Sequence, residues 1–236
     1  MIPTYGPYVF SNAVKSFWKI RETQAEKGIS DQGSRPAVTG GQQMNGFVEK
    51  IEELIVAVGV NASDVYTAKD KELPGFFRPT KEWDIVVVSE GKLRAAIELK
   101  SQVGPSFGNN FNNRTEEAIG SAVDIWTAYR EGIFKQSPQP WLGYLFLLEE
   151  CPKSTTPVKI SEPHFLVFPE FKKASYAKRY ELLCRKLVLE RHYSASCFIL
   201  TNKQLAKRTE NYSEPSDDLS VNQFLTQLLS HVSTRV

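Results

Sequence analysis

The chain has 236 residues, of which 41% are hydrophobic and 24% are charged, and its formal net charge is +2. This length and composition predict one domain with one core and exclude an intrinsically disordered chain. The N-terminus lacks the basic and apolar segments of a secretory signal, and no apolar run is long enough to span a bilayer. We therefore expect a single domain over residues 1–236 of a cytoplasmic protein that does not associate with membranes.

The three cysteines and three histidines are far apart in the sequence. Without a CxxC pair or clustered histidines, the sequence argues against a disulfide framework, a zinc knuckle and a histidine-based metal site. Charge is distributed unevenly, because residues 172–191 hold seven basic and two acidic side chains. This segment is either an anion-binding surface or a solvated helix face, and its composition alone does not decide between the two.

Helical periodicity in the N-terminal quarter of the chain predicts two helices. The first covers residues 11–27, and the second begins at Asn45, a suitable N-cap, and ends near Val58. A Gly/Ser/Pro-rich connection from Ile29 to Asn45 separates them. Both helices therefore precede the strongest strand signals.

Those strand signals lie in the middle of the chain. Two β-forming runs, at 83–88 and 93–100, are separated by a turn at 89–91. A loop rich in Gly and Asn follows over 102–112, and Asn113 then begins a capping-box pattern that predicts a helix.

The remainder of the chain adds strands and helices in alternation. Strands are predicted at 141–148 and 164–168, and helices at 176–189 and 221–232. This order predicts an α/β fold in which a central mixed β-sheet is flanked by helices. We expect its core at about 45–150 and a C-terminal helical part at about 170–236.

Three charged side chains interrupt the central strands: Asp84, Glu98 and Lys100. Alternate residues of a strand share a face, so Glu98 and Lys100 point the same way. Two carboxylates on one face would form an oxygen site suited to Mg²⁺, and a neighbouring lysine could activate a water. The alternative is an exposed Asp and a Glu–Lys pair on a solvated strand, which the strand-turn-strand context disfavours.

Whether Asp84 shares that face depends on the register of the hairpin. A two-residue turn would place Asp84 opposite Ile97, on the wrong face. A three-residue loop pairs Val88 with Lys92, and hence Asp84 with Ala96, on the same face as the other two charges. The glycine of the turn favours the three-residue loop, which is therefore our prediction.

Asp84 and the run Glu98-Leu99-Lys100 resemble the PD-(D/E)xK nuclease signature, although Trp83 stands where the signature has Pro. The segments 78–84 and 96–114 resemble more specifically the XhoI family of type II restriction endonucleases, which cut within CTCGAG. The similarity continues through residues 173–176 and 184–187. It implies a restriction-endonuclease-like core and a single endonuclease domain from a prokaryotic cytoplasm.

The resemblance also implies roles for individual residues. Asp84, Glu98 and the backbone carbonyl of Leu99 would bind Mg²⁺, and Lys100 would activate the attacking water. Nucleases of this superfamily often add an acid from the first core helix. The helix predicted from Asn45 contains Glu49, Glu52 and Glu53. Glu52 lies nearest its apolar stripe and is the candidate, although an exposed glutamate would show the same pattern.

DNA contacts are expected from the polar segment that follows the second strand and from basic residues near the site. Asn pairs with adenine edges and Arg with guanine edges in the major groove, although the same composition suits an ordinary Asx-turn loop. Lysine and arginine elsewhere are better suited to phosphates. The candidate DNA-binding residues are Arg78, Lys81, Gln102, Asn109, Asn110, Asn112, Asn113, Arg114, Lys172 and Lys173.

The predicted function is a Mg²⁺-dependent type II restriction endonuclease that binds double-stranded DNA as a homodimer. The resemblance implies cleavage after the first C of CTCGAG, which leaves 5′-overhangs. A cognate DNA methyltransferase would act on the same site without stable binding to this protein. The alternatives are a repair or resolvase-type nuclease of the same superfamily and a catalytically inactive DNA-binding protein.

Overall fold

The structure is a computed structural model that describes Gly6, residues 8–30 and residues 42–233, with only the backbone described for residues 25–30. Most of the predicted connection between the first two helices lies outside the described residues. Within them, no helix is both long and apolar enough to cross a membrane.

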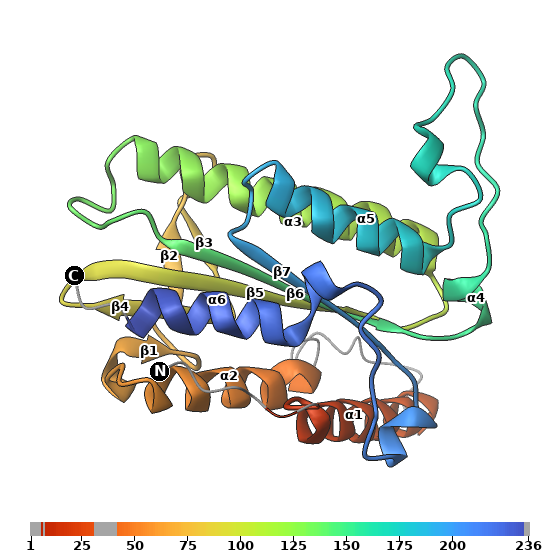
Figure 1. The fold of residues 1–236 in the computed structure, drawn as a ribbon, viewed down its shortest axis with the longest axis horizontal. Helices are drawn as coiled ribbons and strands as arrows, with labels where there is room; N and C mark the ends of the chain where they lie inside the picture. The colour runs from red at the N-terminus through yellow and green to blue at the C-terminus, as the bar shows by residue number, and fades with distance from the viewer. Residues whose placement is uncertain (1–5, 7, 31–41, 234–236) are drawn as a thin grey trace.

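A five-stranded mixed sheet with the strand order β1-β4-β5-β6-β7 forms the centre of the fold (Figure 1). Its strands are β1 (Val65–Tyr66), β4 (Ile85–Ser89), β5 (Lys92–Gln102), β6 (Trp141–Glu149) and β7 (Ala195–Thr201). The pairs β1–β4 and β4–β5 are antiparallel, and β5–β6 and β6–β7 are parallel. A separate antiparallel hairpin is formed by β2 (Glu72–Pro74) and β3 (Thr80–Glu82).

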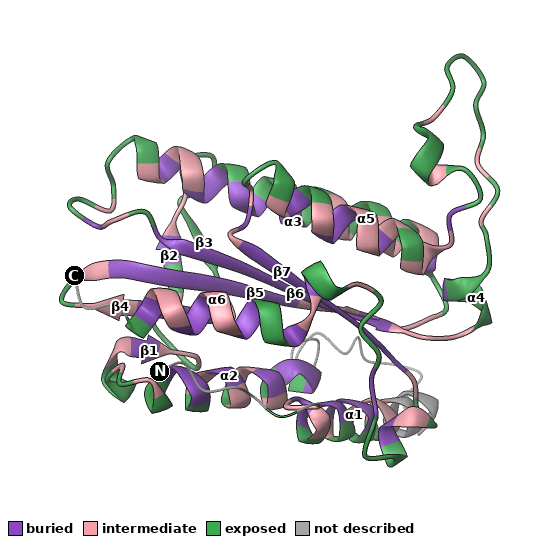
Figure 2. Cartoon of the chain, viewed as in Figure 1, coloured by how far each residue is buried: buried purple, intermediate pink, exposed green. Residues whose placement is uncertain are grey.

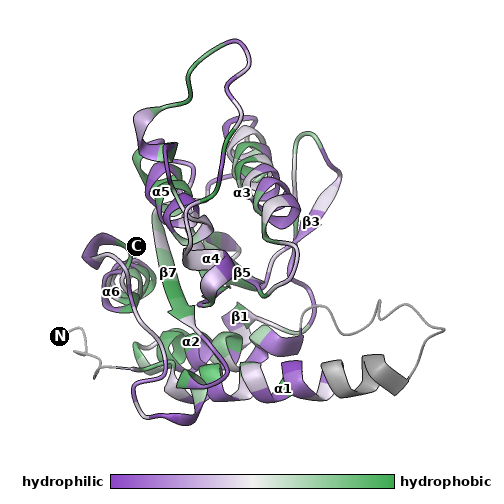
Figure 3. Ribbon diagram, turned by 90° about the vertical axis from the view of Figure 1, so that its right-hand side faces the viewer, coloured by the Kyte–Doolittle hydropathy of each residue, from purple (hydrophilic) through white to green (hydrophobic). Residues whose placement is uncertain are grey.

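Helices cover both faces of this sheet, as the burial colours of Figure 2 also show. One face packs against α3 (Phe107–Arg130) and α5 (Tyr176–Leu189), and the other against α1 (Ser11–Ser30), α2 (Asn45–Ala57) and α6 (Val221–Ser233). The strands β6 and β7 are apolar along nearly their whole length because both of their faces are buried, and Figure 3 shows the hydrophobic colour of β7. The predicted mixed sheet flanked by helices is confirmed.

The remaining helical elements are short. They are α4 (Pro152–Thr155) and single 3₁₀ turns at Gln42–Met44, Ala62–Asp64, Pro169–Phe171, Leu205–Lys207 and Asp217–Leu219. Between α4 and α5 the chain projects from the body as a long loop (Figure 1). The strand predicted at 164–168 is wrong, because this segment lies in that loop, where Phe165, Leu166 and Phe168 are exposed and pair with no strand of the sheet.

One predicted N-cap and one predicted helix start are also wrong. The N-cap of α2 is Met44, and Asn45 is the first helical residue. The helix α3 begins at Phe107, so Asn113 lies within it, and of the predicted loop over 102–112 only residues 103–106 connect β5 to α3. The ring of Phe107 stacks on Tyr176 with centroids 5.8 Å apart, and this packing holds the Asn-rich segment in a helix that its local composition disfavours.

The hairpin register differs from the prediction, although the predicted face is correct. Ser89 pairs with Lys92, so the turn has two residues, Glu90 and Gly91, which both have the positive φ of a type I′ turn. A β-bulge at Arg94 then adds one residue to β5. The predicted pairs Val88–Lys92 and Asp84–Ala96 are therefore wrong. A two-residue turn alone would place Asp84 on the face opposite Glu98, but the extra residue of the bulge returns it to the face of Glu98.

Beyond the bulge, Ile85 pairs with Ile97 and Val86 with Ala96. Continuing this register sets Asp84 beside Glu98. From Ala95 onwards, the odd residues of β5 pack towards α1, α2 and α6, while the even residues face α3 and α5. The bulge thus places Asp84 at the end of β4 next to the face that carries Glu98.

Candidate active site

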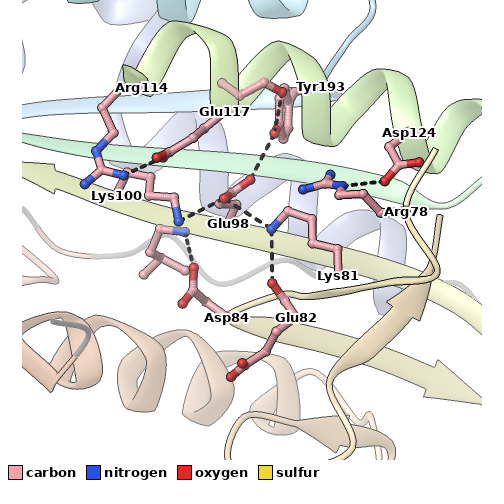
Figure 4. A network of polar contacts seen from close by, with 12 residues as sticks. Arg78, Lys81, Glu82, Asp84, Glu98, Lys100, Arg114, Glu117, Asp124 and Tyr193 are labelled. Atoms are coloured by element: carbon pink, nitrogen blue, oxygen red, sulfur yellow. Dashed lines mark hydrogen bonds and ion pairs between the residues drawn. The ribbon is translucent and has the colours of Figure 1, made fainter. Parts of the chain in front are cut away.

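The strands β4 and β5 bring Asp84, Glu98 and Lys100 together at one end of their shared edge (Figure 4). The ammonium nitrogen Nζ of Lys100 lies 2.9 Å from Oε1 of Glu98. Asp84 immediately precedes β4, and its Oδ2 accepts a hydrogen bond of 2.7 Å from the backbone N–H of Leu99. The structure therefore brings the three residues together: Glu98 and Lys100 lie on β5, and Asp84 is hydrogen-bonded to the backbone of β5.

Glu98 is the centre of this arrangement and is only 2% exposed. A buried carboxylate requires partners, and three side chains supply them. Besides Lys100, Nζ of Lys81 lies 3.2 Å from Oε1, and the hydroxyl of Tyr193 lies 3.3 Å from Oε2. The same hydroxyl is 3.1 Å from the carbonyl oxygen of Ala118 on α3, which ties the site to the helix above it.

The two carboxyl groups have opposite electrostatic environments. Burial would raise the pKa of Glu98, but the ammonium groups of Lys100 and Lys81 lower it below its usual value. Burial raises the pKa of Asp84, and neither the hydrogen bond from Leu99 nor the charge of Lys100 offsets it. Glu98 is therefore stabilised as a carboxylate, whereas the ionised form of Asp84 lacks sufficient compensation.

The two lysines differ in the same manner. Burial would lower the pKa of Lys100, but the negative charge of Glu98 raises it, so this ammonium is held in its charged form. For Lys81 burial prevails over the attraction of Glu98 and lowers the pKa. Lys81 also lies over the ring of Trp83, 4.5 Å from its centroid. Lys100 is therefore the more firmly charged of the two cations next to Glu98.

The oxygen ligands of this site suit Mg²⁺. The N–H and C=O of one strand residue point to the same side, so the carbonyl of Leu99 faces the side of Asp84, beyond the end of β4. Two carboxylates, one carbonyl and water molecules would complete a hard-cation site. Among the residues with described side chains, no group of three or more His, Cys, Asp or Glu gathers to hold a metal ion.

Glu52, the candidate additional ligand, lies on α2, which packs against the face opposite Glu98. Its Oε2 accepts a hydrogen bond of 2.9 Å from the hydroxyl of Thr67. A role for Glu52 at the metal stays a prediction.

Nine of the ten candidate DNA-binding residues fall into three groups. Asn109, Asn110, Asn112, Asn113 and Arg114 lie in the first two turns of α3 rather than on a loop. Arg78 and Lys81 belong to the β2–β3 hairpin, and Lys172 and Lys173 are exposed at the end of the projecting loop. The structure thus presents a helix end, a hairpin and a loop as candidate DNA contacts.

Gln102 is placed differently, because its side chain is buried. Its carbonyl oxygen accepts a hydrogen bond from the hydroxyl of Tyr180, and its amide nitrogen lies 3.4 Å from the carbonyl oxygen of Ser106. A direct contact of Gln102 with DNA would first require these bonds to break, and this contact stays a prediction.

Much of the basic segment 172–191 is paired with acids. Arg185 bonds both Glu181 and Asp218, and Lys186 lies 2.8 Å from Glu190. These pairs match a solvated helix face better than an open anion-binding surface.

Two site residues were not recognised as such in the sequence. Lys81 was expected to contact phosphate, but its ammonium lies on Glu98 because the three-residue strand β3 carries it there. Tyr193 is 95 positions from Glu98. A strand of three residues and a single distant tyrosine give no periodic signal, so only the tertiary structure identifies them.

A mixed sheet with helices on both faces, in which an Asp at the end of one strand meets the Glu-x-Lys of the next, is the arrangement of a restriction-endonuclease-like nuclease core. Comparisons with known proteins identify the family. The protein-family model described as "Restriction endonuclease XhoI" matches residues 23–214 of this chain. The chain belongs to the XhoI restriction endonuclease family.

Individual relatives agree with this family. The chain is 57% identical to "Type II restriction enzyme BstVI" of Geobacillus stearothermophilus over 209 residues. This alignment covers 86% of this chain and 93% of the relative. The chain is 50% identical over 181 residues to "Type II restriction enzyme XhoI" of Xanthomonas vasicola, covering 75% and 73%. No solved structure matches the chain.

Type II restriction enzymes are site-specific deoxyribonucleases, so this chain is an enzyme of that class and its substrate is DNA. The family therefore decides against the alternatives of a resolvase-type nuclease and an inactive DNA-binding protein.

Proposed function

We propose that this enzyme hydrolyses DNA at the palindrome CTCGAG in a Mg²⁺-dependent reaction, cutting after the first C of each strand to leave 5′-overhangs. The resemblance of segments 78–84 and 96–114 to the XhoI family supports the sequence of the site. The observation that carries the proposal is the convergence of Asp84, the Leu99 backbone and the Glu98–Lys100 pair at one end of β5.

In this proposal Asp84, Glu98 and the carbonyl of Leu99 hold the Mg²⁺ ion. When bound, the ion supplies a Lewis acid for the phosphate and lowers the pKa of a coordinated water. Lys100 remains protonated beside Glu98, since the carboxylates raise its pKa. Its ammonium therefore donates hydrogen bonds to the attacking water and to the phosphate, and so it orients the nucleophile and stabilises the charge of the transition state.

DNA binding would involve side chains of both α3 and the β2–β3 hairpin. The exposed Asn109, Asn112 and Asn113 on the first turns of α3 are suited to base edges, and Arg114 and Arg78 to guanine or phosphate. The described part of the chain forms one such site, whereas a palindrome offers two equivalent phosphates related by a dyad. A homodimer with two-fold symmetry would match both, and a cognate methyltransferase would modify the same sequence.

The proposal is tested with a plasmid that contains one CTCGAG site. In Mg²⁺ we expect one linear product, with ends that map after the first C on both strands, and no cleavage in EDTA. Plasmids with one altered base pair of the hexamer should remain uncut at that position. Cleavage of an altered site as fast as CTCGAG, or blunt ends, would contradict the proposed specificity.

A further inference from the structure

The loop of the β2–β3 hairpin, Gly75 to Pro79, exposes two adjacent phenylalanines. Phe76 is 55% and Phe77 67% exposed, and their rings contact each other edge to face with centroids 5.3 Å apart. Arg78 follows directly and is also exposed. Large aromatic side chains of soluble proteins are usually buried, so an exposed pair beside a cation indicates a binding surface.

This aromatic pair is held in place by Asp124 of α3, whose side chain is 4% exposed. Its Oδ1 accepts hydrogen bonds of 2.7 Å from the backbone N–H groups of both Phe76 and Phe77. Its Oδ2 accepts one of 2.8 Å from Nε of Arg78. Burial would raise the pKa of Asp124, but these partners lower it, so it remains a carboxylate. The loop is therefore a preorganised structure.

Gly75 supports the same conclusion. A Cβ atom at this position would lie 2.3 Å from Oδ2 of Asp124, which is closer than real Cβ contacts allow. The close approach of the loop backbone to α3 thus requires glycine, and it fixes the position from which the aromatic rings project.

The loop is continuous with the active site through the hairpin that carries it. Lys81 follows Arg78 by three residues and lies 3.2 Å from Glu98. Figure 4 shows Arg78 directed to Asp124 and Lys81 directed to Glu98. A duplex whose phosphate reaches Asp84 and Glu98 must therefore pass close to the loop.

We propose that this loop is an aromatic wedge that packs against DNA bases next to the scissile phosphate. Arg78 contacts the backbone, and Phe76 and Phe77 press on a base step and partly unstack it, as apolar wedges do in other DNA complexes. The same hairpin brings Lys81 to Glu98 in the proposed DNA-cleaving site, which favours DNA over a second protein chain as the occupant. This inference rests on the proposed location of the active site.

The test uses a CTCGAG duplex in which 2-aminopurine replaces the adenine that pairs with the T after the scissile phosphate, bound in Ca²⁺ so that no cleavage occurs. Wild-type protein should raise the fluorescence of the probe, because unstacking relieves its quenching. The double variant Phe76→Ala/Phe77→Ala should lose this increase and bind about tenfold or more weakly. Both side chains are more than half exposed, so the variant should keep the wild-type melting temperature.

Two controls separate the possible outcomes. Ile133 is 53% exposed on the turn after α3, and Ile133→Ala should leave binding and fluorescence unchanged. Arg78→Ala should lower the slope of log affinity against log salt by about one, whereas the phenylalanine variant should not.

Wild-type fluorescence and affinity in the phenylalanine variant would overturn the proposal. Loss of dimer in light scattering, with the fluorescence increase retained, would also overturn it and would assign the loop to a protein interface. If wild-type protein cuts the CTCGAG duplex in Mg²⁺ while the wedge test fails, only the wedge is wrong. If it does not cut that duplex, the proposed specificity fails.

Discussion

At the scale of single residues, Asp84 and Glu98 are both buried carboxyl groups near the end of β5, but their partners differ. Glu98 has two ammonium groups and a tyrosine hydroxyl, whereas Asp84 has one backbone N–H. Ionisation of Glu98 therefore stabilises the metal-free fold, whereas ionisation of Asp84 destabilises it. Such uncompensated charge is typical of residues kept for function rather than for stability.

This difference predicts opposite effects of two isosteric substitutions in EDTA at neutral pH. Asp84→Asn should raise the melting temperature, because the folded-state pKa of Asp84 is raised and ionisation destabilises the fold. Its gain should be absent well below the unfolded pKa of 3.8, grow as pH rises from there to the folded-state pKa, and stay constant above it. Glu98→Gln should instead lower stability by about 3 kcal/mol, since it breaks a buried charge pair.

Thermal unfolding of both variants and of wild type, measured by circular dichroism at several pH values, checks this prediction. Both variants should lack cleavage activity. Equal destabilisation by the two substitutions would show that the asymmetry between the carboxyl groups is wrong.

Lys100 should act on the chemical step more than on DNA binding. Lys100→Ala is expected to reduce the single-turnover rate about 100-fold or more, because its ammonium stabilises charge that develops in the transition state. Affinity for the cognate duplex in Ca²⁺ should change only a few-fold. A preserved rate with weakened binding would instead assign Lys100 to a phosphate contact.

At the scale of elements, the β4–β5 hairpin shows how far local sequence specifies the site. Its strands and its catalytic face were predicted, because alternation along a strand is a strong signal. Its register was not, since the turn at Glu90-Gly91 and the bulge at Arg94 offset each other and leave no pattern in the sequence. The strands and the shared face of the three charged residues were therefore predicted, whereas the strand register that brings them together was not.

The first turns of α3 show the opposite situation. The asparagines there predict a loop, yet tertiary packing of Phe107 on Tyr176 and of Phe111 on Tyr180 makes the segment helical. Similarly, β7 was not predicted as a strand, although it is buried along its whole length between the helical layers. In both cases contacts distant in sequence decided the structure.

A helical location makes the role of these asparagines testable without loss of the fold. Replacing Asn109, Asn112 and Asn113 together with alanine should leave the melting temperature unchanged or raise it, because alanine is the better helix former and all three are exposed. Cognate binding should weaken about tenfold or more, since each lost base contact costs about 1–3 kcal/mol. Unchanged preference for CTCGAG over a substituted site in filter binding would remove α3 from base recognition.

At the scale of the whole molecule, one active site per chain must meet two strands of a palindrome. We therefore expect two chains per cognate duplex in multi-angle light scattering, with both strands cut in one binding event. Nicked plasmid should not accumulate when enzyme is in excess. A complex of one chain per duplex, with nicks as the main product, would exclude the symmetric homodimer.

The central claim is that Asp84 and Glu98 hold the metal that cleaves DNA, and single-turnover cleavage of a CTCGAG duplex in Mg²⁺ tests it most directly. Asp84→Ala and Glu98→Ala should each reduce cleavage to background while still binding the duplex. Retention of folding is checked by circular dichroism. Near-wild-type cleavage by either folded variant would show that the metal and the scissile phosphate bind elsewhere.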